Sequence, residues 1–148
     1  DRWILYEDDF SYYSNNLLVE SEREKFTNLE AGPLYATMSA IRPVGPLIDP
    51  FHKDWLVLYS RPQYFGAEIL IENDVSLPSV SWNDEAESVI MYGTSSWTLF
   101  NGDSHNAESV CLKSRSDGKR KQYWTLTTFN LANQVSSVKK GCHSSTIA

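Results

Sequence analysis

The sequence has 148 residues, of which 41% are hydrophobic, and a formal net charge of -6 at pH 7. This length suffices for one large domain or two small ones, and no apolar run approaches the roughly 20 residues that span a bilayer, so we do not expect an integral membrane protein. The acidic balance also argues against a nucleic-acid-binding protein, because phosphate binding requires concentrated Lys and Arg.

The first segment runs from Trp3 to about Val44. Its short aromatic and branched runs are typical of strands, and the acidic residues 7–9 form a polar turn after the first of them. A stretch rich in Pro and Gly follows between Val44 and Asp54, and we interpret it as a linker. The predicted strands of this segment are residues 3–6, 17–19, 26–29 and 38–42.

The second segment runs from Trp55 to Tyr92 and opens with the clearest hairpin of the chain. Two apolar runs, residues 55–59 and 67–71, flank a turn in which Pro62 fixes one backbone angle and Gly66 allows a conformation closed to other residues. Residues 88–92 close the segment as a strand, and residues 93–96 form a short joint.

The third segment runs from Trp97 to about Cys142, and residues 143–148 are predicted to be a frayed tail. Its predicted strands are residues 97–100, 108–112, a long 123–129, and 136–139. The basic run at 113–121 is interrupted by Asp117 and Gly118, so we interpret it as a solvated hairpin loop. The alternative is a docking patch for an anionic surface, a glycan or a protein partner.

The two cysteines, Cys111 and Cys142, have no Cys or His neighbour at the spacing of zinc ligands. An even count in a chain that begins at Asp1 rather than Met indicates a processed, secreted protein with one disulfide, which we favour. The alternative is a pair of buried free thiols in a cytosolic protein.

The three segments repeat at intervals of about 40–50 residues, a period typical of supersecondary repeats. Each opens with a Trp-led apolar run and closes with a Ser-containing strand. Four short strands per unit, without a long helical pattern, predict an all-β fold built from Greek keys.

The residues of the second segment resemble the motif of the βγ-crystallin superfamily. That motif is an aromatic, four residues, a second aromatic, one residue and a Gly, followed some twenty residues later by a Ser on the closing strand. Tyr59, Tyr64, Gly66 and Ser88 match it directly. The resemblance implies a folded hairpin in which the aromatics pack over the glycine turn and the Ser hydroxyl ties the turn back.

The other two segments resemble the motif less closely. In the first, Tyr6, Glu7 and Phe10 match, with Ser39–Arg42 as the closing strand, but one residue is missing between the aromatics and Tyr12 replaces the Gly. The third keeps only the spacing, through Phe100, His105 and Ala107, and closes well with Ser137 and Val138.

Members of this family pair two motifs into one sandwich domain. We therefore expect a βγ-crystallin-like Greek-key β-sandwich at residues 1–93, from motifs 1–44 and 55–92, and an additional Greek-key-like unit at 94–148. Three motifs leave one without a partner in the chain. The resemblance implies either a homodimer through the odd third motif or a diverged half packed on the first domain; a missing fourth motif and a misassigned third are the alternatives.

Many members of the family bind Ca²⁺ through an Asn/Asp pair, two residues, a Ser/Thr and the motif Ser. Asn83, Asp84 and Glu85 open the matching stretch, and Glu87 replaces the usual hydroxyl residue. Oxygen atoms are the ligands that this cation requires. The resemblance implies that Glu7 contributes a backbone carbonyl from the paired motif, so the predicted metal residues are Glu7, Asn83, Asp84, Glu85 and Glu87.

A second Ca²⁺ site is a weaker expectation. Residues 35–40 lack the acidic pair, whereas residues 132–137 keep Asn133 and Ser136 but lose the first position. The competing interpretation of the first site is that Asn83 and Asp84 only cap a turn.

No catalytic pattern is present, since His52, His105 and His143 are scattered and no HExxH or GxSxG sequence occurs. We therefore expect a non-enzymatic, secreted protein with a structural, stress or Ca²⁺-binding role. The alternatives are a recognition module, of the lectin, defence or toxin-associated kind, and an assembly protein that dimerises.

Overall fold

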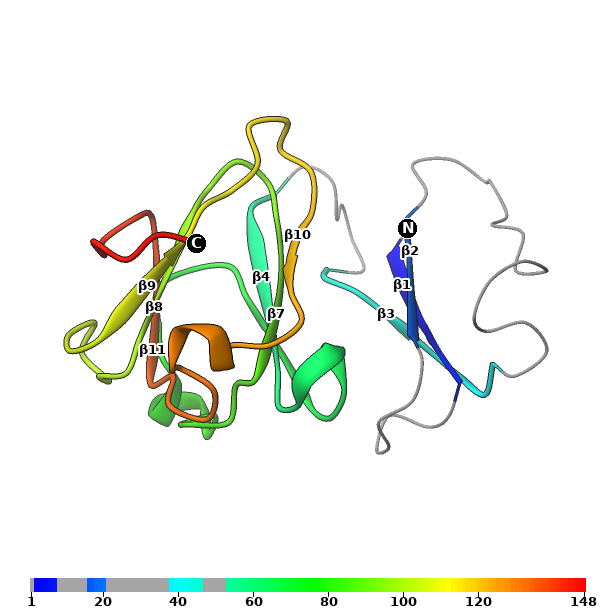
Figure 1. Cartoon of the computed structure of the whole chain (residues 1–148), viewed down its shortest axis with the longest axis horizontal. Helices are drawn as coiled ribbons and strands as arrows, with labels where there is room; N and C mark the ends of the chain where they lie inside the picture. Colours follow the sequence, from blue (N-terminus) through cyan, green and yellow to red (C-terminus); the bar gives the residue numbers. More distant parts are fainter. Residues whose placement is uncertain (1, 8–15, 21–37, 47–52) are drawn as a thin grey trace. The chain divides into compact units, whose positions relative to one another are not determined.

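The computed structural model describes residues 2–7, 16–20, 38–46 and 53–148. It is all-β, as predicted (Figure 1). The chain divides into two compact units, Asp1–Pro50 and Phe51–Ala148. The described helices are short 3-10 turns, none of which could cross a membrane: η1 (Pro62–Tyr64), η2 (Leu77–Val80) and η3 (Thr127–Phe129).

The described part of the first unit is one antiparallel sheet with the strand order β2-β1-β3. In the central strand Ile4 and Tyr6 are fully buried, as expected for an apolar run at the middle of a sheet. The expected strand at 26–29 lies outside the described residues. The three strands are β1 (Arg2–Tyr6), β2 (Asn16–Glu20) and β3 (Ala40–Pro43).

The second unit contains two four-stranded sheets, with the orders β10-β7-β4-β5 and β6-β11-β8-β9. Each sheet takes three strands from one segment and its fourth strand from the other, because β10 pairs with β7 and β6 pairs with β11. The strands are β4 (Trp55–Tyr59), β5 (Glu68–Ile71), β6 (Val75–Ser76), β7 (Ser88–Tyr92), β8 (Trp97–Phe100), β9 (Ser109–Leu112), β10 (Lys121–Tyr123) and β11 (Ser137–Lys140).

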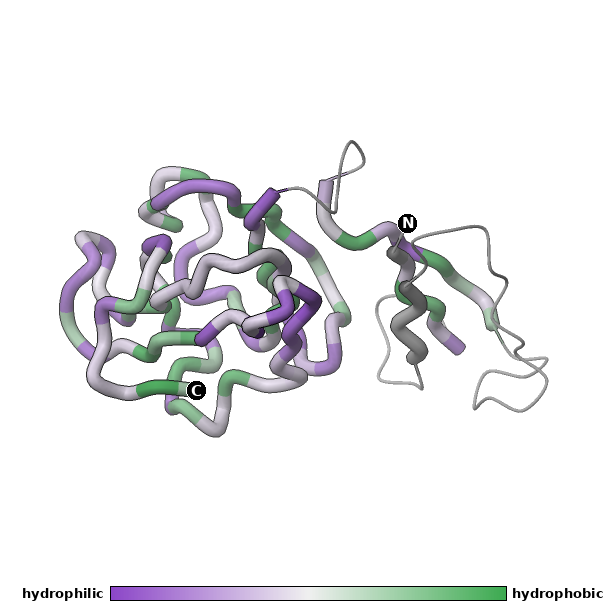
Figure 2. Tube along the Cα trace, turned by 90° about the horizontal axis from the view of Figure 1, so that it is seen from above, coloured by the Kyte–Doolittle hydropathy of each residue, from purple (hydrophilic) through white to green (hydrophobic). Residues whose placement is uncertain are grey.

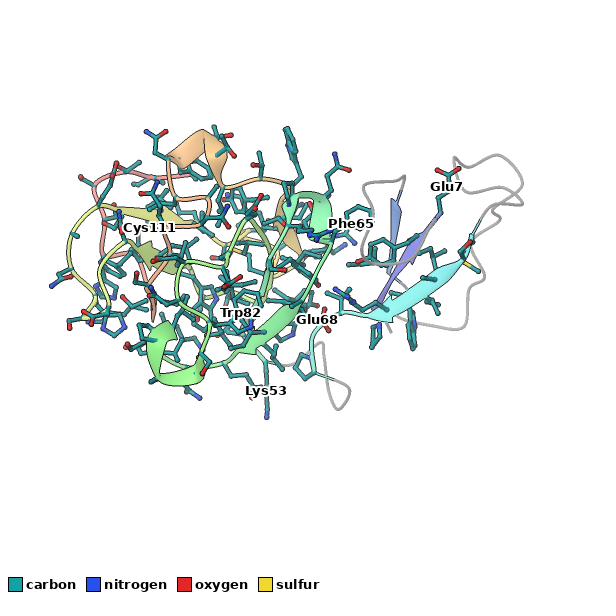
Figure 3. The ribbon with its side chains drawn as sticks, turned by 90° about the horizontal axis from the view of Figure 1, so that it is seen from below. Glu7, Lys53, Phe65, Glu68, Trp82 and Cys111 are labelled. Carbon is teal, nitrogen blue, oxygen red and sulfur yellow. A yellow bond between two sulfur atoms is a disulfide. The ribbon has the colours of Figure 1, made fainter. Side chains whose placement is uncertain are left out.

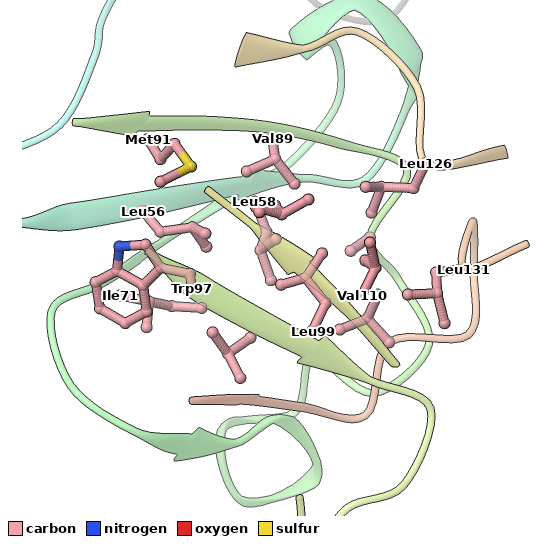
Figure 4. Packing of buried hydrophobic residues seen from close by; sticks show 14 of the residues in the cluster. Leu56, Leu58, Ile71, Val89, Met91, Trp97, Leu99, Val110, Leu126 and Leu131 are labelled. Carbon is pink, nitrogen blue, oxygen red and sulfur yellow. The ribbon is translucent and has the colours of Figure 1, made fainter. Parts of the chain in front are cut away.

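One hydrophobic core lies between these two sheets (Figure 4). Leu56, Leu58 and Met91 from the first sheet meet Trp97 and Leu99 from the second, and all five side chains are at most 1% exposed. Figure 2 shows hydrophobic stretches along the strands and hydrophilic ones at several loops. Inward-facing residues alternate with outward-facing ones, as in a packed sandwich.

The second and third segments therefore form the sandwich together, and the expected boundary after residue 93 is wrong. The exchange of β6 and β10 between the sheets is the physical reason, because neither segment completes a four-stranded sheet alone. The third segment, which we expected to be the odd motif, instead pairs with the second segment in this core.

The expected long strand at 123–129 is also wrong. The strand β10 ends at Tyr123, and the hydroxyl of Thr125 accepts a hydrogen bond from the backbone N–H of Thr127 at 3.1 Å. Such a side-chain-to-backbone bond favours a turn over a strand. The 3-10 helix η3 follows and ends at Phe129, and its C-cap Asn130 has a left-handed backbone conformation with φ of 56°.

Candidate functional site

The second segment folds its β4–β5 connection into a tight hairpin held by one serine. The rings of Tyr59 and Tyr64 meet edge to face, with centroids 5.7 Å apart. Ser88 Oγ accepts a hydrogen bond from the Tyr64 N–H at 3.0 Å and donates one to the carbonyl of Arg61 at 2.6 Å. Gly66 has a φ of +78°, and a Cβ there would collide with Ser60 Oγ, so this position favours glycine. These are the residues that the sequence singled out.

The third segment builds the same hairpin from different residues. The rings of Phe100 and His105 meet edge to face, also with centroids 5.7 Å apart. Ser137 Oγ accepts a hydrogen bond from the His105 N–H at 3.1 Å and donates one to the carbonyl of Gly102. Ala107 takes the place of the glycine with a φ of 66°, which costs about 1–2 kcal/mol for a residue with a Cβ. The third segment is therefore a Greek-key motif despite its poor match.

The stretches 83–88 and 132–137, which precede the two motif serines, meet through reciprocal backbone hydrogen bonds. The N–H of Asp84 donates to the carbonyl of Val135 at 3.1 Å, and the N–H of Asn133 donates to the carbonyl of Ala86 at 2.9 Å. Asp84 and Asn133 have the same left-handed conformation, with φ of 57° and 55°. The two stretches are thus equivalent halves of one arrangement.

The side chains of these two stretches are also hydrogen-bonded to each other in a reciprocal way. Ser136 Oγ donates to Asp84 Oδ1 at 3.0 Å, and Asn133 Nδ2 donates to Glu87 Oε1 at 2.9 Å. We call these two pairs the Asp84 position and the Glu87 position. Each combines one carboxylate from the second segment with one neutral oxygen-bearing side chain from the third.

Main-chain hydrogen bonds fix both stretches against the hairpins. The N–H of Glu87 donates to the carbonyl of Tyr59 at 2.8 Å, as the N–H of Ser136 does to the carbonyl of Phe100 at 2.8 Å. The carbonyls of Glu87 and Ser136 accept in turn, at 2.7 and 2.9 Å, from the N–H groups of the two residues Leu126 and Leu77. The oxygen-bearing side chains therefore project from a rigid backbone.

This donor set fits a hard cation. Carboxylate, hydroxyl, amide and carbonyl oxygens are the ligands that Ca²⁺ takes, usually six to eight of them. The described residues contain no group of three or more His, Cys, Asp or Glu side chains that could hold a metal. A cation at either position would therefore rely on neutral side-chain oxygens, on backbone carbonyls and on water besides its single carboxylate.

The predicted metal residues are distributed unevenly over this arrangement. Asp84 and Glu87 lie at the two positions, while Asn83 donates from Nδ2 to the other oxygen of Asp84 at 2.7 Å. Glu85 is exposed. Trp82, labelled in Figure 3, immediately precedes the stretch. Asp84 is hydrogen-bonded to Ser136 and Glu87 to Asn133 on the opposite stretch.

The expected partner of this stretch was wrong. We expected it to pair with the first segment, through the carbonyl of Glu7, but the paired stretch is 132–137 of the third segment. Glu7 directly follows β1 in the first unit (Figure 3). Asn133 and Ser136 are recognisable in the sequence as a partial match, but Ala132 at the first position of the stretch obscured their role.

The sequence matches no protein-family model and no curated protein. The structure, however, matches the solved βγ-crystallin of Ciona intestinalis, at 20% identity and a TM-score of 0.50 over 58% of this chain and 98% of the other. A structure described as "Evolution of the eye lens beta-gamma-crystallin domain fold" matches at 25% identity and a TM-score of 0.54, over 61% of this chain and 87% of the other. The chain has a βγ-crystallin-like fold.

Spherulin 3a of Physarum polycephalum is a further match, at 26% identity and a TM-score of 0.48, over 62% of this chain and 85% of that one. The shares of this chain matched by the first two structures, 58% and 61%, are similar in size to the unit at 51–148, which holds both motifs of the sandwich. The resemblance inferred from the sequence is therefore confirmed for the fold.

A disulfide and the last residues close one edge of the βγ-crystallin-like sandwich. Cys111 and Cys142 are bonded, with their Cα atoms 5.1 Å apart, which confirms the predicted pairing (Cys111 is labelled in Figure 3). The expected frayed tail is wrong, because the N–H of Cys111 donates to the carbonyl of Thr146 and the N–H of Lys113 to that of Ala148, at 2.8 and 3.1 Å. Closing this loop contributes about 3–4 kcal/mol in the chain-entropy model.

The basic run at 113–121 forms an organised loop. Arg115 donates two hydrogen bonds to the carboxylate of Asp117, at 2.9 and 2.8 Å, and the N–H of Lys119 donates a third at 3.1 Å. These bonds hold the pKa of Asp117 well below its usual range. Burial, followed by the charges of Arg115 and Lys113, lowers the pKa of Lys121. Asp117, the single acidic residue of this run, is thus bonded within the loop, and the loop keeps a net positive charge.

Proposed function

We propose that this chain is a non-enzymatic, secreted, Ca²⁺-binding protein of structural type, in which the ion stabilises the sandwich at residues 51–148. The observation that supports this function best is the reciprocal meeting of the stretches 83–88 and 132–137. There, Asp84 faces Ser136 and Glu87 faces Asn133 at 3.0 and 2.9 Å.

The bound ion would act as a cross-link between the two motifs. Asp84 and Glu87 belong to the second segment, and Ser136 and Asn133 to the third, so shared ligation opposes separation of the motifs. Binding to the folded state alone stabilises by mass action, by about 2.7 kcal/mol when the free ion is at 100 times its dissociation constant. With one carboxylate at each position we expect weak sites, suited to the abundant Ca²⁺ of an extracellular fluid.

The absence of catalysis and the secreted location are parts of the same proposal. His105 is used to hold the third hairpin, since its Nε2 lies 3.1 Å from the carbonyl of Val138. His143 contacts the carbonyl of Lys140 through Nε2 at 3.0 Å, and His52 lies outside the described residues. The disulfide between Cys111 and Cys142 is typical of an oxidising compartment.

Thermal unfolding in EDTA and then in millimolar Ca²⁺ tests this function. We expect Ca²⁺ to raise the midpoint of the wild type and to raise it much less in Asp84→Asn. The amide keeps the size of the side chain, and Asn tolerates the left-handed backbone at this position, so this variant removes mainly the charge. The matched control is Glu85→Gln, which neutralises the adjacent exposed carboxylate.

The same Ca²⁺ shift in Asp84→Asn as in the wild type, or no shift in either, would show that the acidic pair only caps a turn. A loss of the shift in Glu85→Gln alone would place the ion elsewhere on the loop. Asn133→Ala then tests the Glu87 position separately, by the remaining part of the shift.

A further inference from the structure

The charge of this chain is unevenly distributed, and the basic run at 113–121 is the extreme case. It contains five of the thirteen Lys and Arg residues and one acidic residue, a net charge of +4. Because the whole chain carries -6, the other residues together carry -10. A local surplus of this kind attracts an anion to one place on the surface while the rest of the chain repels it.

Hydrogen bonds hold the loop that carries this charge. The N–H of Gly118 donates to the carbonyl of Arg115 at 3.1 Å and closes a turn, and the N–H of Gly93 donates to the carbonyl of Gly118 at 3.2 Å. Ser114 Oγ donates to the carbonyl of Thr94 at 2.7 Å. The loop is thus fastened to the joint between the two motifs, so that little ordering is needed when it binds a partner.

Like charges lie close together on this loop. Burial, followed by the charges of Arg115 and Lys113, lowers the pKa of Lys121, so these three cations act on one another. The ammonium group of Lys121 lies 5.2 Å from the centroid of the Tyr123 ring. Among the residues that the structure describes, the ammonium groups of Lys113 and Lys119 form no ion pair. An anion that bridges the cations would relieve the repulsion between them.

The loop and the candidate ion site lie at opposite ends of the sandwich. The strand β9 ends at Leu112, which is paired with Trp97 at the start of β8, whereas Ser137 is paired with Phe100 at the end of β8. In Figure 1 the loop between β9 and β10 is at the top, and the helix η3 is at the bottom. A ligand of the loop would therefore bind independently of Ca²⁺ at 83–88 and 132–137.

The chemistry of the loop favours one class of anion. Residues 113–119 contain no apolar side chain that could insert into a bilayer. Arg115 uses its Nε and Nη2 atoms on Asp117, and the guanidinium has further N–H donors for an oxyanion. A thin, linear polyanion can follow the loop, whereas a membrane or a nucleic-acid duplex would bring a broad anionic face against the acidic remainder of the chain.

We propose that the loop at 113–121 binds a sulfated polysaccharide. The sulfate groups lie against the exposed Lys113, Arg115 and Lys119, and the chain of the polymer runs along the loop. This function is separate from Ca²⁺ binding and does not depend on it.

Calorimetric titration of the full chain with heparin oligosaccharides, in EDTA, tests the proposal. We expect binding at physiological ionic strength that weakens steeply with added salt, because the polyanion releases counterions when the cations of the loop bind it. Desulfated heparin of the same length should bind at least about 10-fold more weakly, because it has lost most of its charge.

Lys113→Gln and Lys119→Gln locate the contact. The hydrogen bonds that these residues donate within the loop come from their backbone N–H groups, so the variants keep the loop and the melting midpoint of the wild type. Each should weaken heparin binding about 3-fold or more, and the two together at least about 10-fold, because each removes one charge from the contact. The matched control is Lys139→Gln on β11, which should bind within about 2-fold of the wild type, because its charge lies outside the loop.

Four outcomes would each overturn the proposal. They are the absence of heparin binding, equal binding of desulfated heparin, an equal loss in Lys139→Gln and Lys119→Gln, and heparin binding that requires Ca²⁺. Vesicles of phosphatidylserine and phosphatidylcholine provide the comparison with a membrane. Tighter binding to these vesicles than to heparin, lost in Lys113→Gln and Lys119→Gln, would assign the loop to an anionic bilayer instead and would also overturn the proposal.

Discussion

At the scale of single residues, the two motif serines hold the hairpins of the sandwich. Both serines are fully buried. Each hydroxyl accepts a hydrogen bond from one backbone N–H and donates one to a backbone carbonyl. Burial raises the pKa of Tyr64, beside Ser88, to about 12, against a small opposing effect of Arg120, so its phenol stays neutral at physiological pH. The hairpin at Ser88 is thus held by uncharged hydrogen bonds that are buried away from water.

We expect Ser88→Ala and Ser137→Ala each to lower the free energy of unfolding by about 2–3 kcal/mol, because each leaves a buried N–H and a carbonyl without their partner. Urea unfolding followed by tryptophan fluorescence measures this. Ser79→Ala is the control, since Ser79 is exposed and donates to the carbonyl of Ser76 at 2.6 Å. Losses for Ser88 and Ser137 no larger than for Ser79 would mean that the hairpins hold without the serines.

At the scale of elements, Asp54 ties the start of β4 to the joint between the two motifs and to the end of β11. Its carboxylate accepts hydrogen bonds from the N–H groups of Thr94 and Ser95, at 2.6 and 3.0 Å, and from Ser95 Oγ at 2.6 Å. Lys140 Nζ lies 3.3 Å from it. Gly93 makes the approach possible, because a Cβ there would lie 2.9 Å from the Asp54 Cα.

Burial raises the pKa of Asp54, but the hydrogen bonds from Ser95 and Thr94 outweigh it and hold the pKa below its ordinary value of 3.8. A depressed pKa in the folded state stabilises above the unfolded value, and the stabilisation is lost as the pH falls through the folded value. Asp54→Asn should therefore cost about 1–2 kcal/mol at neutral pH and little at the acid end. Urea unfolding from about pH 7 to about pH 2.5 checks this, with Glu72→Gln as an exposed control.

The elements themselves were largely predictable, whereas their partners were not. The β4–β5 hairpin follows from local signals, namely alternation, Pro62 and Gly66. The pairing of β6 with β11 joins Val75 to Val138, and no local pattern encodes a contact so distant in sequence. The third segment also matches the motif least well residue by residue. His105 nevertheless packs on Phe100 as the second aromatic does, and Ala107 adopts the positive φ of the glycine. For that reason the sequence predicts Asp84 as a metal ligand but places its partner Ser136 in a different unit.

At the scale of the whole molecule, the large hydrophobic cluster of the described residues lies in the second unit. The fully buried cluster extends from Leu56 to Val138 and draws on both sheets of the sandwich. A unit with its own core and a disulfide is able to fold alone. We expect a fragment of residues 51–148 to unfold cooperatively and to keep the Ca²⁺-dependent rise in its midpoint.

This fragment tests whether the sandwich alone binds the ion, because the candidate ion site belongs to residues 83–137. Circular dichroism melts of the fragment and of the full chain, in EDTA and in Ca²⁺, measure this. A folded fragment without the Ca²⁺ shift seen in the full chain would place the ion site outside the sandwich. An unfolded fragment would show that the sandwich is not an independent domain.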